Sequence, residues 1–483
     1  MKKTCWMIAL LVWTGCAALP SGVSGQARPI PTRKYNILLI AIDDLNDWVG
    51  CLGANPDAKT PGIDRLAARG VLFTNAHCQA PICNPSRTSF MLGLRPSTTG
   101  IYMNRPWFRS TPANKDRVTL TQHFGDQGYK TLATGKIYHT SRKDPPSFQV
   151  QGPRPGQRVP QDKKLVRDIA SKSRLWDYGP QLYEEEKFGD HITADWAVRQ
   201  LKERHDKPFF LSVGFYRPHV PWYAPKRIFD QIDHTKLSLP PTKKGDRDDL
   251  PAFARKLTEN PLPPPHEWWM KNDRWKKGVE AYHASTRFTD EQVARLLDAL
   301  DQSPYAENTI VVLLSDHGFF LGEKQRWAKQ SLWERATRVP LIVSVPGGST
   351  GRCERPAELL SLFPTLIDLC GVAKREELEG ASLRPLLENP KAPWKRPAIC
   401  TFGQNNHAIR SERYRYIQYA DGSRELYDHQ TDPNEWTNLA ADPAYGKIMA
   451  EHARWIPKLN VPDARGTRSG KANKAKAGRS RSK

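Results

Sequence analysis

Two short polar clusters in this chain directly follow apolar runs. Asp43 and Asp44 come after the run 36–42, and Asp316 and His317 come after a second run of the same kind. Adjacent carboxylates at the end of a strand repel each other unless a positive charge lies between them, so the first pair favours a hard divalent cation. Taken alone, an Asp-Asp pair is more often an exposed turn. The second pair supports the metal interpretation because it occupies the same position after a buried run.

A cysteine within a longer motif lies between the two clusters. The residues from Cys83 to Pro96 read Cys-Asn-Pro-Ser-Arg-Thr-Ser-Phe-Met-Leu-Gly-Leu-Arg-Pro. For a Cys-x-Pro pattern alone, a buried structural cysteine beside a turn is the common explanation. The whole run, however, resembles the signature of the formylglycine-dependent sulfatases, in which a Cys two residues before Pro and four before Arg is oxidised to Cα-formylglycine. Segments 60–67 and 73–77 resemble the residues that precede this signature in the family.

The resemblance extends from about Tyr35 to Leu439 and is nearest to the iduronate-2-sulfatase branch of the family, within the alkaline-phosphatase-like superfamily. It implies a single metal ion, expected to be calcium, bound by Asp43, Asp44, Cys83, Asp316 and His317. Many sulfatases have Asn where His317 stands, and imidazole suits a transition metal better than calcium, which prefers oxygen. Because the iduronate-2-sulfatase branch has His at this position, we interpret His317 as specific to that branch.

Four further basic residues lie in segments that resemble sulfatase motifs. Lys136 and His139 lie in Gly-Lys-Ile-Tyr-His, His219 in Arg-Pro-His-Val-Pro and Lys329 in Trp-Ala-Lys. A lone Lys or His is more often solvated or structural, but a sulfate ester needs concentrated positive charge to be bound and stabilised. The resemblance implies that Lys136 and Lys329 bind sulfate oxygens and that His219 acts near the leaving-group oxygen. It also implies that His139 orients or deprotonates the formylglycine hydrate and that Arg87 fixes this hydrate and the metal shell.

The mechanism implied by the resemblance is metal-assisted covalent catalysis. One oxygen of the hydrate of formylglycine 83 would bind the cation and attack sulfur, while the alcohol leaves with a proton from a nearby acid. The second hydroxyl would then expel sulfate as the aldehyde forms again. The expected substrate is a sulfated glycan, such as one with a terminal 2-O-sulfated uronate unit. The expected partner during maturation is a formylglycine-generating enzyme.

These residues need a scaffold, and the apolar patterns predict an α/β fold. Runs 36–42 and 309–314 are expected to be strands buried on both faces, as in a parallel sheet, and 208–215 a further strand. The segment 293–300 has apolar residues at helical spacing. Ligands of such sheets bind beyond the carboxyl ends of the strands. We predict a large, mixed, mostly parallel sheet flanked by helices, as in alkaline phosphatase and the sulfatases, with a smaller C-terminal α+β subdomain.

The predicted organisation has four parts. The N-terminal residues have the order of a secretory signal, and their apolar stretch is too short to span a membrane. The C-terminal residues are rich in Lys and Arg and include no apolar residue larger than Ala, which favours a disordered tail. Two proline-rich stretches, 143–164 and 237–265, are expected to be surface insertions. The four parts are a signal peptide at 1–25, a catalytic domain at 33–390, an α+β subdomain at 391–464 and a basic tail at 465–483.

The formal net charge of +22 implies anionic partners, and charge alone admits nucleic acid, anionic lipid and acidic polysaccharide. Together with the signal and the resemblance, it predicts a secreted or periplasmic enzyme that binds sulfated glycan, without a nucleic-acid partner or a membrane span. Lipid attachment at Cys16 is disfavoured because Trp13 stands where a small aliphatic residue is usual.

The cysteines point to neither a zinc ribbon nor a disulfide framework. Outside the signal, they lie at positions 51, 78, 83, 353, 370 and 400, with no Cys-x-x-Cys pair among them. If Cys83 is modified, an odd number of thiols remains. At least one of them is then expected to stay free or to pair between molecules.

Three alternatives remain open at this point. A phosphonate or phosphate monoester hydrolase of the same superfamily would share the fold and the metal site. A choline-sulfatase-like enzyme would need a cage for a quaternary ammonium group, for which Trp268, Trp269 and Trp275 are candidates. The third alternative is an inactive protein that binds sulfated glycan through its basic charge, which would leave the whole catalytic set unused.

Overall fold

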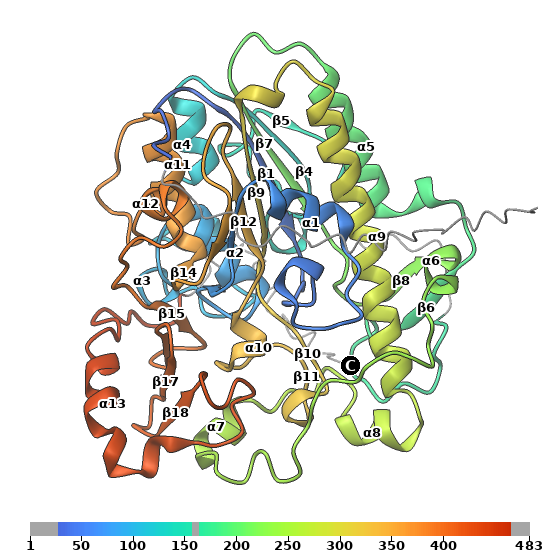
Figure 1. Ribbon diagram of the computed structural model, residues 1–483, viewed down its shortest axis with the longest axis vertical. Coiled ribbons are helices and arrows are strands. Elements are labelled where there is room, and N and C mark those ends of the chain that lie inside the picture. The colour runs from blue at the N-terminus through green and yellow to red at the C-terminus, as the bar shows by residue number, and fades with distance from the viewer. Residues whose placement is uncertain (1–27, 157–163, 465–483) are drawn as a thin grey trace, which may run out of the picture.

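The computed structural model describes residues 28–156 and 164–464 (Figure 1). The predicted signal peptide at 1–25 and the predicted basic tail at 465–483 lie outside these described residues. Within them, no helix combines the length and the apolar composition that crossing a membrane requires.

A mixed sheet of eight strands forms the centre of the larger part of the molecule (Figure 1). Its central strands β9, β1, β7 and β4 are parallel neighbours, whereas β12 is antiparallel to β9. Every residue of β1, β7 and β9 is buried, as their apolar runs predict. In spatial order the strands are β13 (Gly351–Cys353), β2 (Val71–Phe73), β12 (Leu341–Ser344), β9 (Thr309–Ser315), β1 (Asn36–Ile42), β7 (Phe209–Phe215), β4 (Lys130–Gly135) and β5 (Val150–Gln151).

Helices cover both faces of this sheet. Because successive side chains of a strand point to opposite faces, Leu38 and Ile40 of β1 join one apolar core, and Ile37 and Leu39 join another. The first core includes residues of α1 (Pro61–Ala68), α5 (Gly189–Lys202) and α9 (Trp275–Asp301). The second includes residues of α2 (Cys83–Leu92), α4 (Leu120–Asp126) and α11 (Leu362–Cys370). This arrangement confirms the predicted layered α/β fold.

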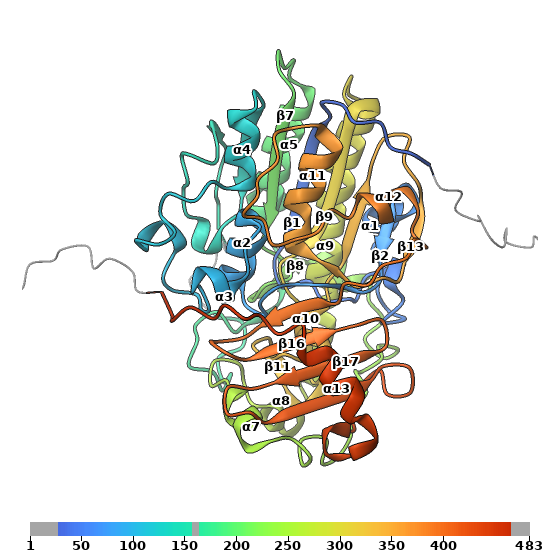
Figure 2. The same cartoon turned by 90° about the vertical axis from the view of Figure 1, so that its left-hand side faces the viewer.

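A separate antiparallel sheet forms the C-terminal subdomain, which lies below the large sheet in Figure 2. Apolar residues of its strands pack with those of helix α13 (Gly446–Ala453), which confirms the predicted α+β character. The strands are β15 (Ala398–Thr401), β16 (His407–Arg410), β17 (Tyr414–Gln418) and β18 (Arg424–Asp428). At the junction with the larger part, Arg410 and Arg415 pair with Glu334 of α10 (Glu334–Thr337).

The two predicted insertions contribute more than surface loops. The first supplies β5, which pairs in parallel with β4 at the edge of the large sheet. The second contains α7 (Ala252–Leu257), and residues 260, 262 and 263 line the cavity described below. The remaining helices and strands are α3 (Pro96–Thr99), α6 (Lys226–Asp230), α8 (His266–Lys271), α12 (Arg384–Glu388), β3 (Ala76–His77), β6 (Tyr178–Gln181), β8 (Trp222–Pro225), β10 (Phe320–Leu321), β11 (Trp327–Ala328) and β14 (Ala357–Glu358).

Candidate active site

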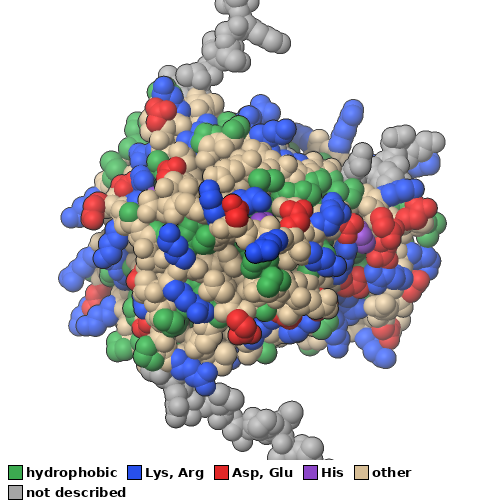
Figure 3. Space-filling model, turned by 90° about the horizontal axis from the view of Figure 1, so that it is seen from above, with side chains coloured by type: hydrophobic (Ala, Val, Ile, Leu, Met, Phe, Trp, Pro, Cys, Tyr) green, Lys and Arg blue, Asp and Glu red, His purple; other side chains and the backbone are tan. Residues whose placement is uncertain are grey.

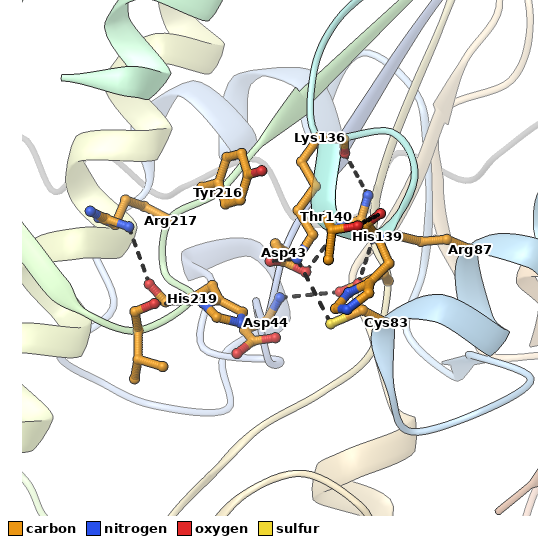
Figure 4. Close-up of polar contacts among 12 residues, drawn as sticks. Asp43, Asp44, Cys83, Arg87, Lys136, His139, Thr140, Tyr216, Arg217 and His219 are labelled. Carbon is orange, nitrogen blue, oxygen red and sulfur yellow. Dashed lines mark hydrogen bonds and ion pairs between the residues drawn. The ribbon is translucent and has the colours of Figure 1, made fainter. Parts of the chain in front are cut away.

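The predicted site residues converge at the carboxyl ends of neighbouring parallel strands. Asp43 and Asp44 follow β1, Asp316 and His317 follow β9, and Lys136 follows β4. Since the carboxyl ends of adjacent parallel strands meet at one edge of a sheet, residues far apart in the sequence are brought together here. Figure 4 shows the side chains from β1, α2 and the loop after β4 pointing toward one another.

Two glycines allow the loop after β4 to enter the site. Gly135 has a φ of 68°, and a Cβ there would lie 2.0 Å from the Gly214 carbonyl oxygen. A Cβ on Gly214 would lie 2.1 Å from the carbonyl oxygen of Lys136. In this close approach the Lys136 N–H donates to the Gly214 oxygen at 2.8 Å. The backbone conformation therefore requires glycine and directs Lys136 toward the carboxylates.

Two buried carboxylates pair with one buried guanidinium. The Arg87 Nε donates to Asp316 Oδ2 at 2.8 Å, and its Nη2 donates to Asp43 Oδ1 at 3.1 Å. Its Nη1 donates to the Lys136 carbonyl oxygen at 2.6 Å, so Arg87 ties β1, β4 and β9 together. Burial raises the pKa of Asp43, but the charges of Lys136, His219 and Arg87 outweigh it and hold this pKa well below its usual value.

The donor set of this cluster fits a divalent cation. Ligand atoms of Asp43, Cys83, Asp316 and His317 all lie within 4.8 Å of one another. Asp44 Oδ2 is buried and has no hydrogen-bond partner among the described residues, and such an orphaned anionic oxygen is costly unless something positive binds it. Three carboxylates supply the hard oxygen ligands that such an ion prefers.

The tautomer of His317 follows from its hydrogen bond. Its Nδ1 lies 3.0 Å from the Gly318 carbonyl oxygen, which can only accept, so Nδ1 carries the proton. The lone pair of Nε2 then faces the cluster, 3.4 Å from Asp44 Oδ1. This is the orientation in which a histidine binds a metal. The structure thus brings together the four predicted protein ligands other than residue 83.

Cys83 is the first residue of α2 and lies beside this cluster. Its Sγ is 3.3 Å from His317 Nε2, 3.4 Å from Lys329 Nζ and 3.9 Å from Lys136 Nζ. The same two lysines donate to the carboxylates, Lys136 to Asp43 and Lys329 to Asp44. Burial raises the pKa of the Cys83 thiol to about 12. An unmodified thiol here would therefore stay protonated at neutral pH.

Two further histidines border the cluster (Figure 4). His139 lies in a short 3-10 turn, and its Nδ1 is buried without a hydrogen-bond partner in the part of the chain that the structure describes. Burial and the charge of Lys136 lower the pKa of His139 to about 3. His219 donates from Nδ1 to the Val220 carbonyl oxygen at 2.6 Å, which leaves the lone pair on Nε2. Its ligand atom lies within 4.8 Å of those of Asp44 and Cys83.

A cavity of about 510 Å³ opens onto the cluster. Six of the predicted residues line it, namely Asp44, Cys83, Lys136, His139, His219 and Lys329. Sequence reasoning missed other residues of the wall, which include Asn104, Thr140, Trp176, Tyr216 and Gln330. The position of Tyr216, directly after β7, could have indicated it, and its ring lies 5.3 Å from Lys136 Nζ. Asn104 and Trp176 lie in loops without a motif, so no local signal indicated them.

The family model described as Sulfatase matches residues 35–372. The chain belongs to the sulfatase family. This membership confirms the predicted family and the predicted enzyme class, a sulfuric ester hydrolase. A second model, described as N-sulphoglucosamine sulphohydrolase, C-terminal, matches residues 322–461.

Individual proteins similar to this sulfatase cover most of its length. A sulfatase of Formosa agariphila is 40% identical over 442 residues, which are 89% of this chain and 87% of that protein. The iduronate 2-sulfatase of Mus musculus is 33% identical over 417 residues, 75% of this chain and 73% of that protein. The solved structure of a 2-O GAG sulfatase superimposes with a TM-score of 0.66 at 25% identity, covering 87% of this chain and 91% of that one.

Proposed function

We propose that this sulfatase removes sulfate from a sulfated glycan, with a terminal 2-O-sulfated uronate unit as its preferred substrate, and that Cys83 is converted to Cα-formylglycine. The observation that carries the proposal is the position of the Cys83 side chain, between two lysine Nζ atoms and the buried carboxylate cluster. The names of two similar proteins, an iduronate 2-sulfatase and a 2-O GAG sulfatase, support the uronate and the 2-O position.

A single calcium ion is proposed at the cluster, held by Asp43, Asp44, Asp316, His317 and residue 83. Two observations support this assignment: Asp44 Oδ2 is buried without a partner among the described residues, and the Nε2 lone pair of His317 lies 3.4 Å from the other oxygen of the same carboxylate. When bound, the ion supplies positive charge that stabilises a nucleophilic oxygen at residue 83 and the charge that builds up on sulfate. Arg87 keeps Asp43 and Asp316 in position for it.

The formylglycine hydrate would supply two hydroxyl groups, one to attack sulfur and one to release the sulfate afterwards. Lys136 and Lys329 would bind sulfate oxygens, since their Nζ atoms flank residue 83 and charge-assisted hydrogen bonds to a developing anion stabilise the transition state. His139, with its orphaned Nδ1, would orient the hydrate or accept its proton.

His219 is proposed to act near the leaving-group oxygen. The hydrogen bond from Nδ1 to the Val220 carbonyl oxygen fixes the orientation of the imidazole ring, and His219 lines the cavity. To act as an acid, the ring would have to bind a second proton at Nε2, and this proton would then pass to the departing alcohol.

Maturation and location follow from the same proposal. Conversion of Cys83 requires a formylglycine-generating enzyme as a partner. The predicted signal at 1–25 supports a secreted or periplasmic protein, where extracellular glycan is accessible.

The test is a panel of sulfated and phosphorylated compounds given to the purified enzyme, with sulfate and phosphate release measured separately. We expect sulfate release from terminal 2-O-sulfated uronates to have the highest kcat/KM. Preference for neutral sulfated sugars or aryl sulfates would contradict the uronate assignment alone. Preference for phosphate or phosphonate esters would contradict the proposed substrate class.

A further inference from the structure

A second, larger groove adjoins the active-site cavity. It has a volume of about 1260 Å³ and shares two wall residues with the cavity, Asn260 and Pro263. The continuous segment 326–329 also borders both the groove and the cavity. Arg326 and Trp327 line the groove, and Ala328 and Lys329 line the cavity. We call this space the extension groove. A substrate longer than one sugar unit could therefore extend into it from the site of cleavage.

Two arginines of the extension groove lack the partners that buried arginines normally have. Arg326 is only 6% exposed, yet it forms no ion pair with any described carboxylate, and its Nε has no hydrogen-bond partner there. Its Nη atoms donate only to the carbonyl oxygens of Thr258 and Lys329. Arg247 is half-buried, and its Nε is likewise buried without a partner among the described residues. Two N–H donors of positive groups thus have no hydrogen-bond partner among the described residues.

The electrostatics of Arg326 differ from those of three buried arginines elsewhere in the described chain. Arg87, Arg95 and Arg415 are buried, and each pairs with a carboxylate. For Arg326, burial and then the charge of Arg247 lower the pKa to about 9. Two like charges that share a low-dielectric space are unfavourable unless an anion lies between them.

The rest of the groove wall is mixed in charge. Lys172 and Lys271 add positive charge, and Glu259 and Glu267 add negative charge, but all four of these side chains are exposed. Solvent screens exposed charges, whereas the two arginines are shielded. The most strongly anion-attracting part of the groove is therefore the part lined by Arg247 and Arg326.

We propose that the extension groove binds the sugar unit next to the one that is cleaved, and that Arg247 and Arg326 bind an anionic group, sulfate or carboxylate, on that unit. This inference rests on the proposed function, since it assumes a sulfated glycan in the cavity. Guanidinium groups suit this role because their N–H donors match the oxygens of both anions. The enzyme would then prefer glycans with a second anion over singly charged substrates.

The test compares two disaccharides with the same terminal 2-O-sulfated uronate, one with and one without a sulfate on the second sugar. We expect the enzyme to have an about tenfold higher kcat/KM for the disaccharide with two sulfates, the size of one charge-assisted hydrogen bond. Arg247→Ala should remove this preference by lowering kcat/KM mainly on the disaccharide with two sulfates. Lys256→Ala, which removes an exposed cation of α7 outside the groove wall, should keep the preference.

Arg326→Gln provides a second variant, but Arg326 also contacts the carbonyl oxygen of Lys329, so this substitution can disturb the cavity as well. Calorimetric binding of both disaccharides to Cys83→Ala, with and without Arg247→Ala, measures the groove independently of turnover. An equal affinity for the two disaccharides, or the same loss on both in Arg247→Ala, would overturn the inference. Binding with the expected preference but no sulfate release by the unsubstituted enzyme would contradict the proposed function instead.

Discussion

At the scale of single residues, the surroundings of Cys83 distinguish a modified residue from a reactive thiol. A catalytic thiol needs a lowered pKa, whereas burial and the nearby Asp43 raise the pKa of Cys83 to about 12. The flanking lysines would instead provide charge for the proposed anionic substrate. The six cysteines outside the predicted signal form no disulfide bond in the structure. The sequence predicts that at least one thiol stays free or pairs between molecules.

Substitution of Cys83 is the first prediction. Cys83→Ala should abolish turnover and leave the fold intact, because the side chain borders a polar cavity. Cys83→Ser should stall after at most one turnover, because serine can be esterified by sulfate but has no second hydroxyl to expel it. Mass spectrometry of the peptide should detect an aldehyde in the native enzyme and a sulfate ester in the serine variant. Steady turnover by the serine variant, in a host that does not convert serine, would refute the mechanism.

Metal dependence is the second prediction. Chelation should remove activity and calcium should restore it, because Asp43, Asp44 and Asp316 offer hard oxygen ligands and Asp44 Oδ2 is buried without a hydrogen-bond partner among the described residues. Asp316→Asn should reduce kcat/KM by about 100-fold or more, since it removes a ligand charge and the partner of Arg87. Asp298→Asn is the matched control, because that aspartate lies in an exposed ion pair. Restoration by zinc alone would contradict the calcium assignment.

All ten predicted site residues come together, but the sequence could not predict the whole site. Asp43 and Asp316 could be found because they follow apolar strands, whereas Cys83 and the basic residues were found because their motifs resemble those of the sulfatases. Cavity residues such as Asn104 and Trp176 come from irregular loops, where position depends on tertiary packing rather than on a local pattern. A sequence also cannot show that Arg326 forms no ion pair with a described carboxylate.

At the scale of elements, the turn after β4 gives the third prediction. Gly135→Ala would place a Cβ against the Gly214 oxygen in a backbone conformation with positive φ, so we expect lower stability and a raised KM through displaced Lys136. Gly128→Ala is the control, because its φ is 89° but no atom lies within 4 Å of the added Cβ. The control should lose about 1 kcal/mol of unfolding free energy, and Gly135→Ala distinctly more. Denaturant unfolding and steady-state kinetics measure both effects, and equal losses in the two variants would refute the steric argument.

The central strands were predictable because they are apolar throughout. The expected strands 36–42, 208–215 and 309–314 correspond to β1, β7 and β9 within one residue at each end. Short strands such as β2 and the antiparallel β12 were not predicted, because a few apolar residues do not distinguish a strand from a buried turn. The pairing of β5 with β4 was missed for the same reason, since β5 is short and follows a proline-rich stretch.

At the scale of the whole molecule, the junction between the large sheet and the C-terminal subdomain gives the fourth prediction. The charges of Arg410, His429 and Arg415 outweigh burial and hold the pKa of Glu334 well below its usual 4.5. This carboxylate therefore stabilises the fold fully above about pH 4.5, and the stabilisation is lost as pH falls through the lower folded-state pKa. Glu334→Gln should lose about 3 to 5 kcal/mol at neutral pH, because it leaves the buried Arg410 without its carboxylate partner and removes one of the two carboxylates that pair with Arg415.

The pH dependence and a control separate this effect from general acid unfolding. The unfolding free energy of Glu334→Gln should fall less steeply below about pH 4.5 than that of the unsubstituted enzyme. Glu412→Gln removes an exposed ion pair with Arg355 and should cost at most about 1 kcal/mol. Identical pH profiles for Glu334→Gln and the unsubstituted enzyme would contradict the assigned role of this carboxylate.

Truncation after Ala464 is the fifth prediction. The removed residues include no apolar side chain larger than Ala, so turnover on a small substrate should not change. The Ala464 N–H donates to the Gly100 carbonyl oxygen at 2.8 Å, so a cut before this residue would remove an ordered contact. A truncation that also removes Ala464 is expected to reduce activity or to cause misfolding. Either outcome after the truncation that keeps Ala464 would contradict the prediction.

Part of the net charge of +22 comes from the Lys- and Arg-rich residues 465–483, and the rest comes from the remainder of the chain. On the face shown in Figure 3, Lys and Arg side chains lie among Asp and Glu side chains instead of forming one continuous basic patch. Dispersed charge of this kind attracts polyanions at long range without selecting one of them. Selection would then be made in the cavity and the extension groove, where positive groups are shielded from solvent.

The burial of Cys83 determines when its oxidation can occur. Its side chain is 1% exposed at the base of a cavity of about 510 Å³, which can admit a sugar but not the catalytic centre of another enzyme. The proposed conversion would therefore have to precede folding, and a molecule that folds first would keep its thiol. A preparation with incomplete conversion would contain two populations that do not exchange, one with the aldehyde and one with the thiol. Its specific activity would report the ratio of these populations, so a true kcat would require counting the aldehydes and not the protein.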